Sequence, residues 1–184
     1  MTGSFGKPDA TGRSSGKRSG RARKLRSPPK GEPWVWLTRE LVESPAWGAL
    51  NLTSRKLIDF LLIEYMAHAG TENGALVATH GQLGEFGLSR RLISDAVEEC
   101  VFLGLLRVQQ RGGLSWGGMK RPSLYRLTFY PDKDDGPPTN EWKGKTEEAI
   151  TEWRRDRRRL RARKKIPAPT LVHPPHPQSE AGAE

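Results

Sequence analysis

Two adjacent arginines behind a helix-capping residue are the side chains in this sequence best suited to binding an anion. Ser89 can cap a helix whose first turn carries Arg90 and Arg91, and Ser94 and Asp95 follow on the same outward face. Guanidinium groups bind phosphate or make bidentate contacts to guanine, and backbone N–H groups at a helix N-terminus favour a phosphate. We therefore expect these five residues to contact nucleic acid.

A glycine-rich loop carries a second basic group. Arg111, Lys120 and Arg121 flank the glycines of residues 112–118, and Trp116 lies at the tip. Because glycine has no side chain, such a loop lets the backbone approach a duplex closely, and the cations then reach its phosphates. Trp116 either contacts the nucleic acid or folds back onto the hairpin.

Two further sets of polar residues are candidate phosphate contacts. One opens a short helix, where Thr79 is the expected N-cap. The other lies in residues 151–166, which hold nine cations and two acids. We expect binding by Thr79, His80 and Gln82 in the first set and by Arg154, Arg155 and Arg158 in the second. Clustered cations release counterions from a phosphate backbone, so the second set predicts tight, salt-sensitive and sequence-independent binding.

The net charge of +10 is unevenly distributed along the 184 residues. Residues 1–30 hold nine cations and one acid, whereas residues 31–131 hold ten of each. The excess therefore lies in the two flanks, and the neutral middle is long enough to bury a core. This arrangement predicts a folded unit with two charged arms and a polyanionic partner.

Several classes of protein conflict with the sequence. It has no glycine loop ending in Gly-Lys-Ser/Thr, no metal-ligand cluster and no nucleophile placed beside a base by a motif, so we expect neither an enzyme nor a cofactor. No stretch approaches the ~20 apolar residues of a membrane helix. The single cysteine, Cys100, allows no internal disulfide and is expected to be buried. We expect a cytoplasmic, nucleoid-associated protein without membrane contact.

Periodicity indicates the elements that must position these residues. Thr38 is the expected N-cap of a short helix that is interrupted near Pro45, and Thr53 or Ser54 is the expected cap of a helix to residue 69. Trp34, Trp36, Trp47, Phe60 and Phe102 are expected in the core. That first helix is followed by a turn containing Trp47 and Leu50. Further helices are predicted at 52–69, 79–86 and 89–103, and strands at 75–78, 105–110 and 123–130, the last two forming an antiparallel hairpin.

The composition also predicts the domain boundaries. We expect a disordered basic arm at 1–32, a folded domain at 33–131, a linker at 132–145, a basic helix at 146–166 and a disordered proline-rich tail at 167–184.

The order of elements resembles the winged helix-turn-helix fold. The match is carried by LGEFGLSRRLISDAVEECVFLGLL (83–106), SPAW (44–47), NG (73–74), GGLSWGG (112–118) and YRLT (125–128). These segments are similar to small winged-helix proteins of bacterial plasmids, phages and mobile elements. The resemblance implies an α+β domain with a three-helix core and a β-hairpin wing, in which the helix after Ser89 reads the major groove of double-stranded DNA.

One part of the sequence departs from this family. Asp95, Glu98 and Glu99 stand on the candidate reading helix where many relatives carry basic or amide side chains. These acids would repel phosphate unless Asp95 accepts a hydrogen bond from a cytosine amino group or pairs with Arg91.

Three functional hypotheses remain at this point. The first is a non-catalytic DNA-binding protein that acts as a transcription regulator or accessory factor of a plasmid, phage or mobile element. The second is an origin-binding replication initiator that uses the same module on repeated sites. The third is a general RNA or ribosome binder that acts through its basic arms. A homodimer through the segment around Glu147 to Leu160 is disfavoured by its charge.

Overall fold

The computed structural model describes residues 31–114 and 120–165, and the side chains of Leu114, Lys120 and residues 163–165 are outside that description. The expected arm at 1–32 and tail at 167–184 therefore lie almost entirely outside the described residues, as does Trp116. No helix in the described ranges is long and apolar enough to span a bilayer.

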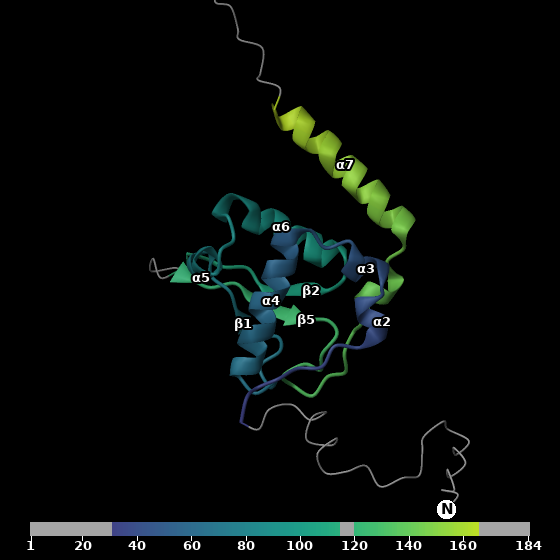
Figure 1. Cartoon of the computed structure of the whole chain (residues 1–184). Helices are drawn as coiled ribbons and strands as arrows, with labels where there is room; N and C mark the ends of the chain where they lie inside the picture. The colour runs from purple at the N-terminus through teal and green to yellow at the C-terminus, as the bar shows by residue number, and fades with distance from the viewer. Residues whose placement is uncertain (1–30, 115–119, 166–184) are drawn as a thin grey trace, which may run out of the picture.

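The described chain is an α+β fold in which helices pack on a small antiparallel sheet (Figure 1). The sheet has the order β1-β5-β2, and β3 and β4 form a separate two-stranded ribbon. The strands are β1 (Leu76–Val77), β2 (Leu106–Gln110), β3 (Gly113–Leu114), β4 (Lys120–Arg121) and β5 (Leu124–Leu127). The helices are α2 (Arg39–Val42), α3 (Pro45–Gly48), α4 (Leu52–Ala67), α5 (His80–Glu85), α6 (Arg90–Phe102), the 3-10 helix η1 (Glu141–Gly144) and α7 (Glu147–Lys165).

The core lies between α4, α5, α6 and the sheet. It is formed by side chains at helical spacing on one face of each helix and by inward residues of the strands. Its fully buried members include Leu57, Ile58 and Leu61 of α4, Leu83 of α5, Ile93, Ala96 and Cys100 of α6, and Leu76, Leu106 and Leu127 of the sheet. The predicted inner faces of these helices are confirmed at these positions.

The predicted helix starts are mostly confirmed. The Thr38 hydroxyl accepts a hydrogen bond from the Leu41 N–H, and Thr79 forms a capping box with Gln82. Helix α4 is the exception, because Asn51 caps it in place of Thr53 or Ser54. Ser54 is fully buried, and its hydroxyl donates to Glu99 and does not cap the helix.

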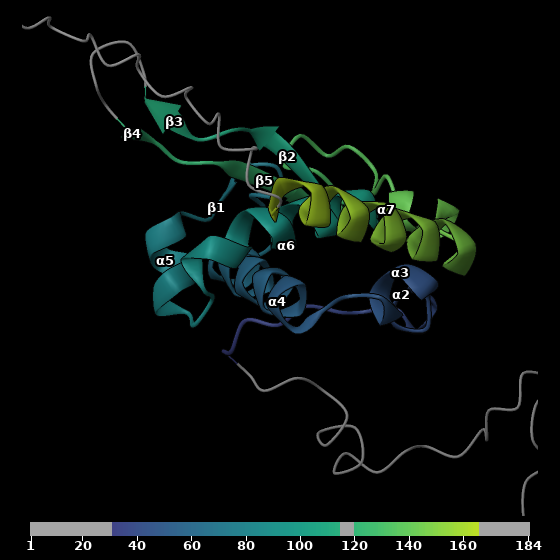
Figure 2. The same cartoon turned by 90° about the horizontal axis from the view of Figure 1, so that it is seen from above.

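A hairpin of β2 and β5 follows α6, as predicted. Leu106 pairs with Leu127 and Val108 with Tyr125, and the register shifts between Val108 and Gln110. The ribbon of β3 and β4 continues the hairpin and projects beyond the helices (Figure 2). The buried Asn73 side chain braces the far end of β5: its amide nitrogen donates to the carbonyls of Leu127, Tyr130 and Pro131, and its oxygen accepts from the Leu127 N–H.

Residues 132–145, predicted to be a linker, instead pack on the folded domain. The Asn140 N–H donates to the Thr128 carbonyl, and Trp142 of η1 is buried. Gly104 makes this contact possible: a Cβ built on it would lie 2.7 Å from the Glu141 carbonyl carbon. The prediction missed this packing because a single tryptophan in a proline- and glycine-rich stretch shows no periodicity.

Two tryptophans predicted in the core are exposed. The residues Trp34 and Trp36 are 58% and 51% accessible, although Trp36 packs edge-on against Tyr130. Trp47 is buried as predicted, and Phe60 and Phe102 are partly buried. Trp34 and Trp36 precede the first helix, so the extended chain carries them across the surface of the domain.

Helix α7 is not a free arm. It begins beside α3 and runs past α6 (Figures 1 and 2), with Ile150 buried and Trp153 stacked on Phe102 at a centroid distance of 4.4 Å. The interplanar angle of this pair is 7°. Helix α7 therefore becomes one wall of the surface that carries the candidate site.

Candidate nucleic-acid interface

The outer face of α6 carries the first predicted set of side chains. Because Ile93, Ala96 and Cys100 are buried, the helical repeat turns the opposite positions to solvent. Ser89, Arg90, Arg91 and Ser94 are accordingly exposed. Ser89 occupies the N-cap position, but its side chain makes no capping hydrogen bond. The predicted exposure of this face is confirmed, and its contacts with DNA stay a prediction.

The start of α5 lies close to this face but offers fewer free groups than predicted. The Thr79 hydroxyl accepts from the Gln82 N–H at 3.2 Å and donates to Gln82 Oε1 at 2.8 Å. Gln82 Oε1 also accepts from the Thr79 N–H. The Thr79 hydroxyl and Gln82 Oε1 are therefore engaged in the capping box, and His80 and Gln82 are the exposed residues at this helix start.

A groove of about 870 Å³ separates α6 from the β2–β5 hairpin. It brings together three predicted residues from three elements: His80 at the start of α5, Ser94 on α6 and Arg111 after β2. Val97 and Val101 of α6 line it as well. The groove is thus lined by hydrogen-bonding groups, by the cations Arg107 and Arg111 and by the carboxylates Glu98 and Glu141, with apolar side chains between them.

The ribbon beyond the groove places the other predicted cations away from the body of the domain. Arg121 is exposed and pairs in register with Gly113. A Cβ on Gly112 would lie 2.9 Å from the Arg121 carbonyl oxygen, so glycine at this position lets the two strands approach closely. Trp116 and the side chain of Lys120 lie outside the described residues.

Asp95 has different partners from those considered in the sequence. Its Oδ1 accepts from Arg157 Nη2 at 2.6 Å and its Oδ2 from Arg161 Nη2 at 2.5 Å. Arg157 also pairs with Glu98 at 2.7 Å. Burial alone would raise the pKa of Asp95, but the hydrogen bonds and charges of the two arginines lower it below its ordinary value. Asp95 therefore holds α7 and does not pair with Arg91.

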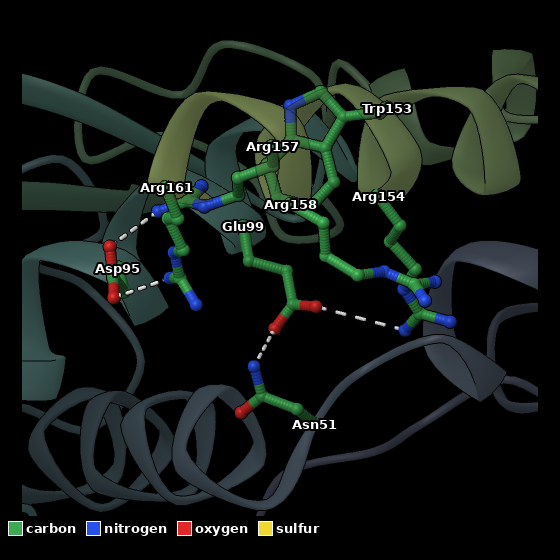
Figure 3. A pocket seen from close by; sticks show the side chains of 8 residues that line it. All are labelled: Asn51, Asp95, Glu99, Trp153, Arg154, Arg157, Arg158 and Arg161. Atoms are coloured by element: carbon green, nitrogen blue, oxygen red, sulfur yellow. Dashed lines mark hydrogen bonds and ion pairs between the residues drawn. The ribbon is translucent and has the colours of Figure 1, made fainter. Parts of the chain in front are cut away.

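Glu99 is the buried centre of the same contact. One carboxylate oxygen accepts from the Asn51 side-chain amide and the Ser54 hydroxyl, and the other lies 3.7 Å from Arg154 Nη2 (Figure 3). Arg154 also donates to the Ala49 carbonyl. Arg154, predicted as a phosphate contact, is thus a brace between α7, α6 and α3. Arg155 and Arg158 remain exposed on α7.

Sequence reasoning missed the residues that join the two helices. Arg157, Arg161 and Trp153 hold the acidic side of α6, and Arg157 also lies over the Trp153 ring at 4.9 Å. Two signals were present: three acids on a helix expected to approach DNA, and arginines four residues apart beside an isolated tryptophan. Periodicity within one helix could not connect them, because the pairing is between helices.

No protein-family model, curated protein or solved structure matches the chain. The geometry of the site is therefore the basis for any functional conclusion. Within residues 31–114 and 120–165, no group of His, Cys, Asp and Glu side chains is placed to hold a metal ion. The described surface offers cations, hydroxyls and an open groove, which suit the binding of an extended anionic partner.

Proposed function

We propose that this chain is a winged-helix protein that binds double-stranded DNA without catalysing a reaction on it. Helix α6 is the reading helix, and the β2–β5 hairpin with its β3–β4 ribbon is the wing. The observation that carries the proposal is the exposed face of α6, with Arg90, Arg91 and Ser94, beside a groove bounded by the hairpin. A helix in this position can enter the major groove while the ribbon follows the backbone.

The docking of α7 supports this proposal on electrostatic grounds. Without α7 docked beside them, the acids of α6 would repel a phosphate backbone; these acids are Asp95, Glu98 and Glu99. Arg157 pairs with Asp95 and Glu98, and Arg154 lies beside Glu99. Each acid therefore has an arginine partner on α7, although Glu98 stays exposed, and Arg91 and Ser94 remain available on the outer face.

The proposal is tested with the full chain and a matched pair of arginine variants. Arg91→Ala removes a cation from the reading face, whereas Arg39→Ala removes one from α2, where the side chain is 87% exposed. Selection from a random duplex library defines the preferred site, and titration then gives the affinity. Arg91→Ala should reduce discrimination at one base pair by about 1–3 kcal/mol, and Arg39→Ala should leave it unchanged. Equal behaviour of the two variants would contradict the proposal.

We further propose that the protein acts as a transcription regulator or accessory factor of a plasmid, phage or mobile element. Support comes from the resemblance of the sequence to proteins of such elements, together with the single reading helix. Footprinting on the DNA that flanks its own gene tests this role. One protected operator beside a promoter is the expected result, and an iterated array of sites would assign the chain to replication initiation instead.

A further inference from the structure

A second pocket lies on the other side of α6, between α7 and the N-terminal end of α4. Its volume is about 170 Å³, enough for several water molecules at ~30 Å³ each. Figure 3 shows guanidinium groups from α7 converging on it from one side, with α6 and Asn51 on the other. The lining residues are Asn51, Asp95, Glu99, Trp153, Arg154, Arg157, Arg158 and Arg161.

The charges around this pocket do not balance. Four arginines line it against two carboxylates, Asp95 and Glu99. Both carboxylates already have partners: the Asp95 oxygens accept from Arg157 and Arg161, and Glu99 accepts from Asn51 and Ser54. Within the described part of the chain, no acid lies within ion-pair distance of Arg158. The pocket therefore keeps an excess of positive charge that an anion would neutralise.

Hydrogen-bond donors are also left over. Arg157 Nη1 is buried and has no hydrogen-bond partner among the described residues. Nη2 of the same guanidinium group forms ion pairs with Asp95 and Glu98. Leaving a buried N–H without an acceptor costs about 1–3 kcal/mol. Planar guanidinium groups match the oxygens of a phosphate, and Arg158 brings an exposed one to the same pocket.

We infer that this pocket binds a single phosphate group through Arg157, Arg158 and Arg161. The group belongs either to a DNA backbone or to a free small phosphate, and the site does not depend on base reading by α6. A bound phosphate offsets the repulsion among these α7 arginines, two of which hold Asp95 of α6, and so stabilises the docked position of α7.

Thermal unfolding of the full chain with inorganic phosphate tests the site. Ionic strength is held constant with chloride, so that general screening is the same in every sample. Phosphate should raise the unfolding midpoint of the wild type more than chloride does. Arg158→Gln should weaken phosphate binding at least about tenfold, the loss expected for one charged hydrogen-bond donor. Equal midpoints of the wild type in phosphate and chloride would overturn the inference.

A matched control keeps the experiment specific to the pocket. Arg159→Gln makes the same charge change one residue along α7, where the side chain is 71% exposed and does not line the pocket. This variant should retain the response to phosphate. If Arg158→Gln and Arg159→Gln lose it equally, the response reflects the charge of α7 and the inference fails. Circular dichroism at low temperature verifies that both variants fold.

Competition with DNA identifies the source of the phosphate. If the backbone supplies it, inorganic phosphate at constant ionic strength weakens duplex binding by the wild type and not by Arg158→Gln. If a free phosphate is the ligand, duplex affinity is unaffected and phosphate still binds the complex. Both results support the site. Arg91→Ala distinguishes this inference from the proposed function, because it should alter base preference and leave the response to phosphate unchanged.

Discussion

The partners of Asp95 change how the acidic residues of α6 are interpreted. Its carboxylate would oppose DNA binding if it faced solvent alone, yet two arginines of α7 hold both of its oxygens. The same contact explains why Arg157 is mostly buried, with 14% of its side chain accessible, in a helix dominated by cations. A residue that looks unfavourable for binding is thus part of the internal structure.

The pH dependence of stability should reveal this role of Asp95. Because its pKa is lower in the folded protein, the carboxylate contributes stability above the unfolded value of about 3.9. That contribution is lost as the pH falls through the lower, folded pKa. Asp95→Asn should therefore lower the thermal midpoint at neutral pH, and the difference from the wild type should shrink below about pH 4. A difference that is constant down to strongly acidic pH would contradict this assignment.

Cys100 should be chemically inert in the folded protein. It is fully buried on the inner face of α6, and burial raises the pKa of its thiol. A thiol-specific reagent should label the native chain only at the rate of unfolding and should label it fully in denaturant. Rapid labelling under native conditions would show that the packing of α6 is looser than described.

At the scale of elements, the turn between α6 and β2 determines where residues 132–145 pack. Gly104 has a positive φ of 71° and lies against the backbone of Glu141 and Trp142. Because Gly104 has no side chain, η1 can pack against this turn at the end of α6. The chain then continues from η1 into α7. Gly104 therefore allows η1 to pack at the position from which α7 starts.

A substitution at this glycine should be costly. Gly104→Ala forces a side chain into a left-handed conformation and against the Glu141 carbonyl, so we expect a loss of about 2 kcal/mol or more in the free energy of unfolding. Gly48→Ala is the control, since a Cβ there meets nothing within 4 Å. Denaturant unfolding measures both. A loss below about 1 kcal/mol at Gly104 would show that the turn adapts.

The elements that could be predicted are those defined by local chemistry. The inner faces of α4, α5 and α6 follow the 3.6-residue repeat, and the capping box at Thr79 is encoded within four residues. The packing of Trp142 and the exposure of Trp34 depend on partners far away in the sequence. The cap at Asn51 is local, since its side chain accepts from the Ser54 N–H, but Thr53 and Ser54 offered equally suitable capping side chains nearby. In the candidate site, Arg91 and Ser94 were predictable from the exposed face of α6. The pairing of α6 with α7 was not, because it joins charges from two helices.

For the whole molecule, the docking of α7 sets the distribution of charge. The sequence predicted a neutral domain with two charged arms, but part of the C-terminal charge is used within the fold. Arg154, Arg157 and Arg161 face acids of α6, whereas Arg155, Arg158 and Arg159 remain exposed. Helix α7 is therefore both a structural brace and a fixed basic wall beside α6.

Limited proteolysis should show whether α7 depends on its aromatic contact. Trp153→Ala removes the stack on Phe102 and the ring beneath Arg157, so α7 should detach more often. Trypsin should then cut after Arg154 and Arg157 at least about tenfold faster, as mass spectrometry of the fragments would record. Leu160→Ala is the control, because Leu160 lies on the same helix and is 59% exposed. Unchanged cleavage of Trp153→Ala would mean that the ion pairs alone hold α7.

The position of α7 after α6 in the chain has a consequence for synthesis. A ribosome completes α6, with Asp95, Glu98 and Glu99, before it adds Arg157 and Arg161. Until then the nascent α6 carries these acids without their arginine partners, and they oppose the attraction of Arg90 and Arg91 for nearby messenger and ribosomal RNA. Once α7 has been made and has docked, each acid has an arginine partner. Under the proposed function, the affinity of α6 for nucleic acid thus develops late in translation.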